Sequence, residues 1–430
     1  MRAALYLLVY GAAAQVRAET GPTAVEAESV AGSAAPRVVG IEFSGNRVTR
    51  PRVMLRELTF DVGDIADPKQ IEASRQAIQN LGLFRAVEVE PVAVSGGEIV
   101  IFTVEEKLYL LPFPRLDAKD SGEYAYGMQM RWTNLFGRNH DLRAFWEYRD
   151  RKEAGIGGET AYAIDYGAPQ LFDSRYSLDV GAGYSTRPVE RDGEVVGDYQ
   201  ETFRSARVQL SRSLSPGSAN QGWWIGGGLG WLEQSTEGAD AEPAYGTATS
   251  MLLGVGYRDL QFRRYSEVGQ TFGLGASVAI EDWNSDYHQL SYRLDWRRYI
   301  AVGQRAHQNL NLGAEAGLRH GGPPDNDAYE LGGSSSLRGY DNDFLEGDAY
   351  YRVSAEFLRP LRWNSLRALA IVEAGNVFEQ PGDASLDRLY TSLGLGLRLR
   401  VDWFVDVELD LGYALPLTGD GGGRVFVGRP

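Results

Sequence analysis

Apolar and polar residues alternate along most of the chain after about residue 108. From Asp141 to Arg149, nearly every second residue is charged, and Leu142, Ala144, Trp146 and Tyr148 stand between them. A period of two predicts β-strands, because successive side chains of a strand point to opposite faces. We expect strands near 111–118, 124–134, 140–150, 159–168, 175–186, 199–213, 223–234, 245–258, 269–281, 287–300, 306–319, 348–358, 365–376, 390–401, 404–415 and 424–429.

The number and the two-faced character of these strands decide between two β architectures. The strands of a soluble β-sandwich also alternate between apolar and polar residues. One apolar and one charged face throughout, with 23 Tyr and 9 Trp, is more typical of a barrel with a lipid-facing exterior and a polar lumen. The total of about sixteen is even, as in bacterial barrels. We therefore expect residues 108–430 to form an all-β transmembrane barrel of about 16 antiparallel strands.

The N-terminal residues follow a different pattern. Arg2, the apolar stretch after it and the small-x-small sequence Val16-Arg17-Ala18 predict a signal peptide over residues 1–18. Residues 19–37 are rich in Ala, Glu, Ser, Gly and Pro, which is typical of a flexible linker. No other segment approaches the roughly 20 apolar residues of a membrane helix.

Residues 38–107 predict a small α/β unit with the order strand, helix, helix, strand, strand. Thr49 is the candidate N-cap of the first helix, and Asp67 followed by Pro68 starts the second. The last two strands are expected at 86–92 and 98–104.

One long connection interrupts the regular strands at 320–347. It contains YELGGSSSLRGYDNDF, residues 329–344, with Arg338 near its centre. If the N-terminal unit is periplasmic, this connection is the sixth loop on the outer side of the barrel. A plain surface loop does not require such an arrangement of glycines, serines and one arginine.

Composition and motifs exclude several classes of function. The net charge of −15 argues against a nucleic-acid-binding protein, and the chain has no cysteine for a disulfide or a thiolate metal site. The sequence contains no HExxH, GxSxG or Walker motif. The histidines lack metal-ligand spacing, so we expect no enzyme, no metal and no cofactor. These histidines are His140, His288, His307 and His320.

The motifs together resemble one family. Residues 38–107, with GN after the first strand, GD between the helices and LGLF after the second helix, resemble a POTRA (polypeptide-transport-associated) domain. With TNLFGRN, ELGGSSSLRGYD and the terminal VFVGRP, the chain resembles the outer-membrane β-barrel assembly family of BamA and TamA type. The resemblance implies a Gram-negative outer-membrane location with a periplasmic POTRA domain. Relatives of the main assembly type carry several POTRA units, and this chain has the length for one.

The resemblance also implies a role for the sixth loop. In that family the loop folds back into the lumen, and its arginine pairs with acidic groups on the wall. Here Arg338 is that arginine, Gly339 permits close backbone approach and Tyr340 can pack on the wall. Glu373, whose parity with Arg367 places it on the lumen face, is the favoured partner. The alternative acidic partners are Asp406, Glu408 and Asp410.

Two surfaces are candidates for binding client chains. The POTRA edge strand from Arg85 to Glu90, with Val87 and Val89, suits β-augmentation. The first and last barrel strands form a candidate lateral seam, because the last strand is short and Pro112 and Pro114 in the first cannot donate ladder hydrogen bonds. The seam residues are Leu111, Phe113, Phe426 and Val427.

The expected function is insertion of proteins into the outer membrane by strand templating at the seam. The expected partners are unfolded outer-membrane proteins as clients, outer-membrane lipids and periplasmic or accessory assembly proteins, with no nucleic acid. Two alternatives remain open: a secretion pore for one dedicated protein, and a lipid-handling or passive channel barrel.

Overall fold

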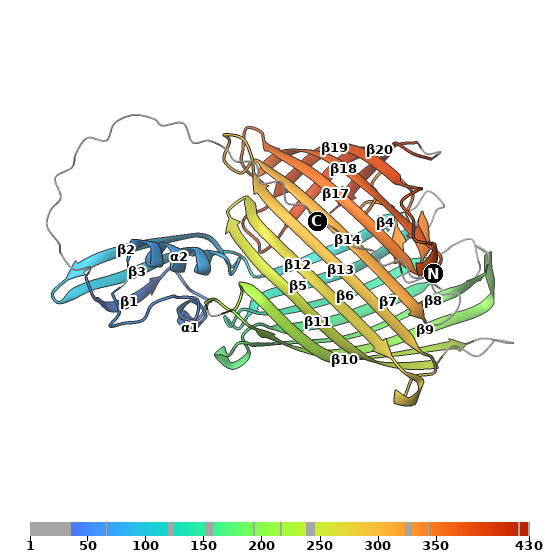
Figure 1. Cartoon of the computed structure of the whole chain (residues 1–430), viewed down its shortest axis with the longest axis horizontal. Helices are drawn as coiled ribbons and strands as arrows, with labels where there is room; N and C mark the ends of the chain where they lie inside the picture. The colour runs from blue at the N-terminus through green and yellow to red at the C-terminus, as the bar shows by residue number, and fades with distance from the viewer. Residues whose placement is uncertain are drawn as a thin grey trace, which may run out of the picture.

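The computed structural model shows a small domain at one end of a large barrel (Figure 1). The predicted signal peptide and nearly all of the predicted linker lie outside the described residues. The structure describes residues 36–65, 67–118, 124–150, 158–191, 194–215, 217–237, 246–322, 329–342, 344–419 and 422–428.

The small domain is a three-stranded sheet with two helices packed on one face. The sheet order is β1-β3-β2, with β1 parallel and β2 antiparallel to β3. Buried apolar residues such as Met54, Ile78 and Phe102 form its core between sheet and helices. Neither helix of the described chain is long and apolar enough to cross a membrane. The elements are β1 (Val38–Ser44), α1 (Pro51–Leu55), α2 (Pro68–Gln79), β2 (Phe84–Val94) and β3 (Gly97–Glu106).

The start of α2 confirms the cap expected there, and the start of α1 does not. Asp67 Oδ1 accepts a hydrogen bond from the Gln70 backbone N–H, and the Gln70 side-chain oxygen accepts one from the Asp67 backbone N–H, which makes a capping box. At α1 the N-cap is Arg50, without a side-chain cap. Thr49 is buried and bonds to the barrel, as described below.

The remaining chain forms one sheet of sixteen antiparallel strands that curves into a barrel (Figure 1). This confirms the predicted fold class. The strands run in chain order from β4 to β21, and each pairs with its neighbours. They are β4 (Leu110–Ala118), β5 (Tyr124–Leu135), β6 (His140–Asp150), β7 (Glu159–Ala168), β8 (Tyr176–Arg191), β9 (Glu194–Ser213), β10 (Gly222–Glu237), β11 (Gly246–Arg263), β12 (Ser266–Ala279), β13 (Gln289–Ala301), β14 (Asn309–Gly321), β17 (Ala349–Pro360), β18 (Leu366–Phe378), β19 (Tyr390–Arg400), β20 (Glu408–Pro416) and β21 (Arg424–Gly428).

Short elements occupy several connections. The strands β15 and β16 pair as a small hairpin within the long connection between β14 and β17. Among the residues that the structure describes, three 3-10 helices lie in other connections. These elements are β15 (Tyr329–Leu331), β16 (Leu345–Gly347), η1 (Leu171–Asp173), η2 (Glu281–Trp283) and η3 (Pro381–Asp383).

The two faces of the barrel wall differ as the alternation predicts. On β19 and β20, Leu395 and Leu411 are 67% and 56% exposed on the outer face. Their neighbours Arg398 and Asp410 face inward and are each 3% exposed. Because the apolar side chains can meet lipid and the charged ones meet each other inside, the wall has the polarity of a transmembrane barrel.

Candidate functional site

The sixth loop folds into the lumen. The tetrapeptide Leu337–Tyr340 lies against the strands β17 to β21, and Leu337, Arg338 and Tyr340 are all buried. The β15–β16 hairpin packs on β18 nearby. The loop thus fills part of the barrel interior from the outer side.

Arg338 contacts three different parts of the barrel. Its Nη1 lies 3.0 Å from Glu356 Oε1 on β17. Its guanidinium lies over the ring of Phe426 on β21, 5.4 Å from the ring centroid. Its backbone N–H donates to Glu373 Oε2 on β18 at 2.7 Å. One residue therefore ties the loop to the first, second and last of the five C-terminal strands.

The favoured side-chain pair between Arg338 and Glu373 is replaced by a different arrangement. Glu373 does bind the loop, but through the backbone of Arg338, while its other oxygen lies 3.4 Å from Arg352. The guanidinium of Arg338 reaches Glu356 instead. Glu356 is a charged residue of β17, and no sequence signal connected it to Arg338.

Gly339 and Tyr340 complete the attachment. Gly339 has φ of +107°, and a Cβ there would lie 3.1 Å from the backbone of Ala414, so the position requires glycine. The Tyr340 hydroxyl lies 2.8 Å from the carbonyl oxygen of Thr391 and 2.7 Å from that of Thr418. These contacts hold the loop against β19 and β20.

An ion-pair network extends along the wall beneath the loop. Arg398 Nη1 lies 3.0 Å from Glu356, and Arg398 forms two 2.7 Å hydrogen bonds to Asp410. Arg367 pairs with Glu408 at 2.9 Å. The alternative acidic partners Glu408 and Asp410 therefore belong to the network without contacting Arg338 directly. Bidentate geometry of this kind is both strong and directional.

Asp406 has a different position from the one expected. It lies in the turn before β20 with φ of +51°, because that strand begins at Glu408 and not near residue 404. Its carboxylate is 3.9 Å from Arg131 on β5. Asp406 therefore sits at the periplasmic rim of the barrel, away from the sixth loop.

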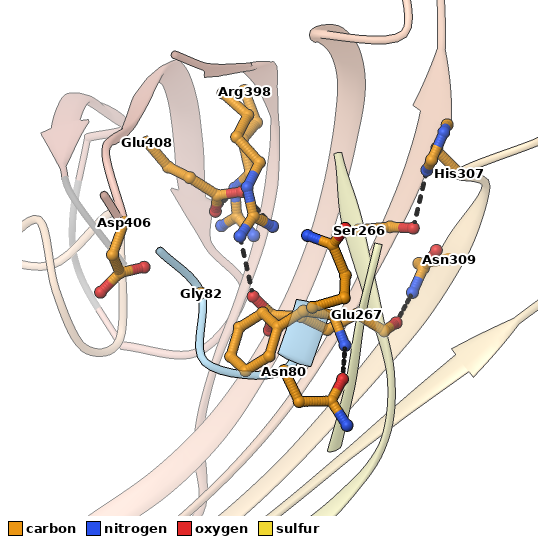
Figure 2. Close-up of polar contacts among 12 residues, drawn as sticks. Asn80, Gly82, Ser266, Glu267, His307, Asn309, Arg398, Asp406 and Glu408 are labelled. Atoms are coloured by element: carbon orange, nitrogen blue, oxygen red, sulfur yellow. Dashed lines mark hydrogen bonds and ion pairs between the residues drawn. The ribbon is translucent and has the colours of Figure 1, made fainter. Parts of the chain in front are cut away.

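Charged residues also cross the lumen near its periplasmic end. Glu267 on β12 lies 3.1 Å from Arg400 on β19, and Figure 2 shows Glu267 pointing toward the group that contains Arg398 and Glu408. In the turns below, Arg264 pairs with Asp402 at 2.6 Å. Two cavities of about 1040 and 830 Å³ remain inside the barrel. The described residues thus fill or cross the lumen at both ends.

The seam lies between β4 and β21, the two ends of the sixteen-strand order. Within the described residues no hydrogen-bonded ladder joins these two strands. Leu111 and Phe113 pair with Arg131 and Gln129 and so share the lumen side of the wall. On β21, Phe426 is buried on the lumen side, whereas Val427 is 69% exposed on the outer side.

The two prolines of β4 direct their nitrogens toward the seam. The carbonyl oxygen of Tyr109 accepts a hydrogen bond from the backbone N–H of Thr133 on β5. Because the backbone groups of alternate residues point to the same side of a strand, the odd-numbered residues of this strand bond to β5. Leu108, at an even position, donates to Trp403 on the C-terminal side. Pro112 and Pro114 also have even numbers, so their backbone nitrogens face away from β5 and toward the seam. The seam-facing edge of β4 therefore lacks two N–H donors.

The POTRA edge strand is placed as expected, but it is partly occupied. The sheet order makes β2 an edge. Arg75 of α2 already donates to the carbonyl of Val87 at 3.1 Å, and the Val87 side chain lies in the domain core. Val89 packs partly against the same core, and Arg85 pairs with Glu105. An added strand has the freest access beyond Val87.

The small domain is docked on the periplasmic turns, a feature that the sequence did not reveal. Thr49 Oγ1 accepts from Asn134 at 2.8 Å. Glu57, whose side chain is fully buried, accepts from Ser218 and, at 3.1 Å, from Asn220. These contacts fix the POTRA domain beneath the barrel.

The helix α2 adds a further contact. Asn80, labelled in Figure 2, accepts a hydrogen bond through its side-chain oxygen from the backbone N–H of Phe262 at 2.9 Å. The contacts of the domain therefore reach turns from the β5–β6, β9–β10 and β11–β12 hairpins. Among the described residues, no group of three or more His, Asp or Glu side chains is arranged to hold a metal ion.

Two family models match the chain. A model described as the Omp85 superfamily domain matches residues 134–424. A POTRA model described as the surface antigen variable number repeat matches residues 36–107. Together they cover both domains described above.

A curated relative and several solved structures are similar to the chain. "Outer membrane protein assembly factor BamA" of Neorickettsia risticii is 24% identical over 195 residues, which is 42% of this chain and 24% of the relative. The chain thus matches about a quarter of that relative's length.

The solved structures agree in fold. BamA of Haemophilus ducreyi lacking POTRA domains 1–3 has a TM-score of 0.51 at 16% identity, covering 91% of this chain and 82% of that one. CdiB of Escherichia coli has a TM-score of 0.62 at 15% identity, covering 92% of this chain and 76% of that one. CdiB of Acinetobacter baumannii has a TM-score of 0.61 at 17% identity, covering 91% of this chain and 73% of that one. The chain belongs to the Omp85 superfamily, and it is a Gram-negative outer-membrane barrel with its POTRA domain in the periplasm.

Proposed function

We propose that this protein inserts client proteins into the outer membrane by templating their strands at the seam, without enzymatic chemistry. The observation that carries the proposal is the interruption between β4 and β21 in an otherwise continuous sheet. Unpaired strand edges are templates for another chain. A client strand that pairs there satisfies its backbone groups as it enters the lipid.

The sixth loop supports this mechanism by holding one side of the seam. Arg338 lies over Phe426, and Arg424 of β21 pairs with Asp341 of the loop. The last strand is therefore attached to the lumen wall through the loop. On the other side, β4 offers few donors because of its prolines. Opening at this line breaks few strand hydrogen bonds compared with any other pair of neighbouring strands.

Of the two alternatives, export of one dedicated protein through the lumen remains the second candidate. The likeness to CdiB and to BamA chains concerns the fold alone and does not choose between the two functions. Export through the lumen requires the sixth loop, the Glu267–Arg400 pair and the docked POTRA domain to move. A passive channel is less well supported, because these same groups obstruct the lumen.

In-cell photocrosslinking separates these functions. A photoreactive residue replaces Leu110 or Val427, which face outward at the seam, or Leu111, which faces the lumen. The matched control is Leu253, an outward residue of β11 far along the sheet from the seam. Several unfolded barrel proteins at the seam sites, and none at the control, are expected.

The other outcomes are equally distinct. One recurring secreted protein captured from Leu111 supports the exporter. Lipid adducts alone at every site contradict templating and leave a lipid-handling barrel.

A further inference from the structure

Two phenylalanines at the periplasmic rim are exposed in an unfavourable backbone conformation. Phe136, in the β5–β6 turn, is 68% exposed, and Phe172, in the β7–β8 turn, is 89% exposed. Their φ angles are +54° and +53°, in a region that bulky side chains rarely adopt. Backbone strain of this kind concentrates at functional positions. An apolar partner is therefore expected at this rim.

Phe136 continues the lipid-facing surface of the barrel. Its ring lies 5.8 Å from the ring of Trp132. Trp132 pairs with Leu110 and Leu142 on the outer face of the wall. Phe136 therefore marks the lower end of the surface that meets lipid, at the depth where aromatic side chains meet headgroups.

The POTRA segment beside these turns is strongly basic. Residues 45–56 carry four arginines and no carboxylate, in a chain with a net charge of −15. Arg50 Nε donates to the carbonyl of Phe136 at 3.1 Å. Arg52 pairs with Asp173, next to Phe172, while its side chain remains 74% exposed. The arginines and the two phenylalanines thus form one surface at the junction of the two domains.

We propose that this surface, made of Arg50, Arg52, Phe136 and Phe172, binds the anionic headgroups of phospholipids in the periplasmic leaflet. Guanidinium groups bind phosphate oxygens with directional hydrogen bonds, and the exposed rings insert beside the acyl chains. Continuity with the lipid-facing wall favours a lipid over a protein as the occupant. The site would align the POTRA domain with the membrane surface.

The test compares lipid retention by the full chain in nanodiscs. The protein is reconstituted with a mixture of phosphatidylcholine and phosphatidylglycerol, extracted, and its retained lipids are measured by mass spectrometry. The wild type is expected to enrich phosphatidylglycerol over the mixture. The double variant Arg50→Glu/Arg52→Glu should lose that enrichment by about fivefold per arginine. The matched control is Arg37→Glu, an exposed arginine before β1 whose carbonyl accepts from Glu98 at the start of β3, the end of that strand that does not lead into the barrel.

The arginine variants could lose lipid because the POTRA domain detaches from the barrel, so a second variant leaves the contacts between the two domains in place. Phe172→Ser changes a side chain that is almost wholly exposed, so folding should be unaffected, and retention should fall severalfold. Equal phosphatidylglycerol enrichment in the wild type and both variants overturns the proposal. A photoreactive residue at position 172 that captures a protein in cells, with no lipid, also overturns it.

Discussion

At the scale of single residues, Arg338 and Glu356 have unequal roles in one ion-pair network. Glu356 lies 3.0 Å from both Arg338 and Arg398. Replacing Arg338 by Ala leaves Glu356 with a partner, so we expect the free energy of unfolding to fall by about 1.5–3 kcal/mol, as for the loss of a hydrogen bond to a charged group. Glu356→Gln leaves two buried arginines without that carboxylate, and should cost about 3–5 kcal/mol. Urea unfolding of the protein refolded in lipid vesicles measures both.

The same loop provides the control for this comparison. Arg424→Ala removes an ion pair with Asp341 whose side chains are 51% and 63% exposed, so its effect should stay below about 1 kcal/mol. If Arg338→Ala costs as much as Glu356→Gln, the central position of Glu356 in the network is wrong.

The partner of Arg338 also shows what residue patterns can and cannot predict. Alternation placed Glu373 on the lumen face, and the structure agrees with that placement. The depth to which the loop enters is set by contacts of its own backbone, such as the Arg338 N–H on Glu373. Backbone contacts leave no residue signature, so the side-chain partner could not be chosen from the sequence.

At the scale of elements, the prolines of β4 predict how tightly the seam closes. Pro112→Ala/Pro114→Ala restores two N–H donors on the edge that faces β21, each worth about 0.5–1.5 kcal/mol if it finds an acceptor. We expect slower hydrogen exchange in β4 and β21 and lower activity in client insertion. The matched control is Pro381→Ala in η3, outside the barrel sheet. Faster exchange in β4 of the double variant would contradict this account of the seam.

The packing of Phe426 predicts a second effect on the last strand. A methyl group at Gly412 would collide with the Phe426 ring and with the Leu395 carbonyl oxygen. Gly412→Ala should therefore displace Phe426 from beneath Arg338 and destabilise the barrel by about 1–3 kcal/mol, as overpacking does. Gly275→Ala on β12 is the control, since its nearest neighbour would be 3.8 Å away. Heat-dependent mobility on gels and urea unfolding compare the two variants.

Strand positions were predictable from the sequence because the alternation is long and regular. The predicted strand at 140–150 coincides with β6. The error at β20 has a physical cause: the alternation of apolar and polar residues continues through Val405 and Asp406, but Asp406 adopts a left-handed conformation and turns the chain. A period-two pattern does not distinguish a strand from a turn with the same residue order.

At the scale of the whole molecule, the docking of the POTRA domain could not be predicted. The groups that meet are 85 residues apart for Thr49 and Asn134, and 163 for Glu57 and Asn220. No periodicity links such positions. They become neighbours only because the barrel closes and brings its periplasmic turns to one rim.

This docking should depend on pH through Glu57. The carboxyl is buried between α1 and the β9–β10 turn, and burial raises its pKa above the ordinary value of 4.5. The protonated form is therefore favoured in the docked state. Docking should be strongest below the ordinary pKa and should weaken as the pH rises through the raised pKa. Glu57→Gln should dock with little pH dependence, because it cannot ionise.

Spin labels can measure the movement of the POTRA domain away from the barrel. The chain has no cysteine of its own, so labels attach only at introduced cysteines. Labels at Lys69→Cys on α2 and Gly217→Cys on the β9–β10 turn report the distance between the domain and the barrel. In the wild type the fraction at longer distance should grow with rising pH, and in Glu57→Gln it should stay nearly constant. Glu90→Gln, at an exposed position of β2, should behave like the wild type. If Glu57→Gln shows the same pH response as the wild type, another titrating group causes the effect. If the wild type shows no pH response, the Glu57 contacts do not control docking.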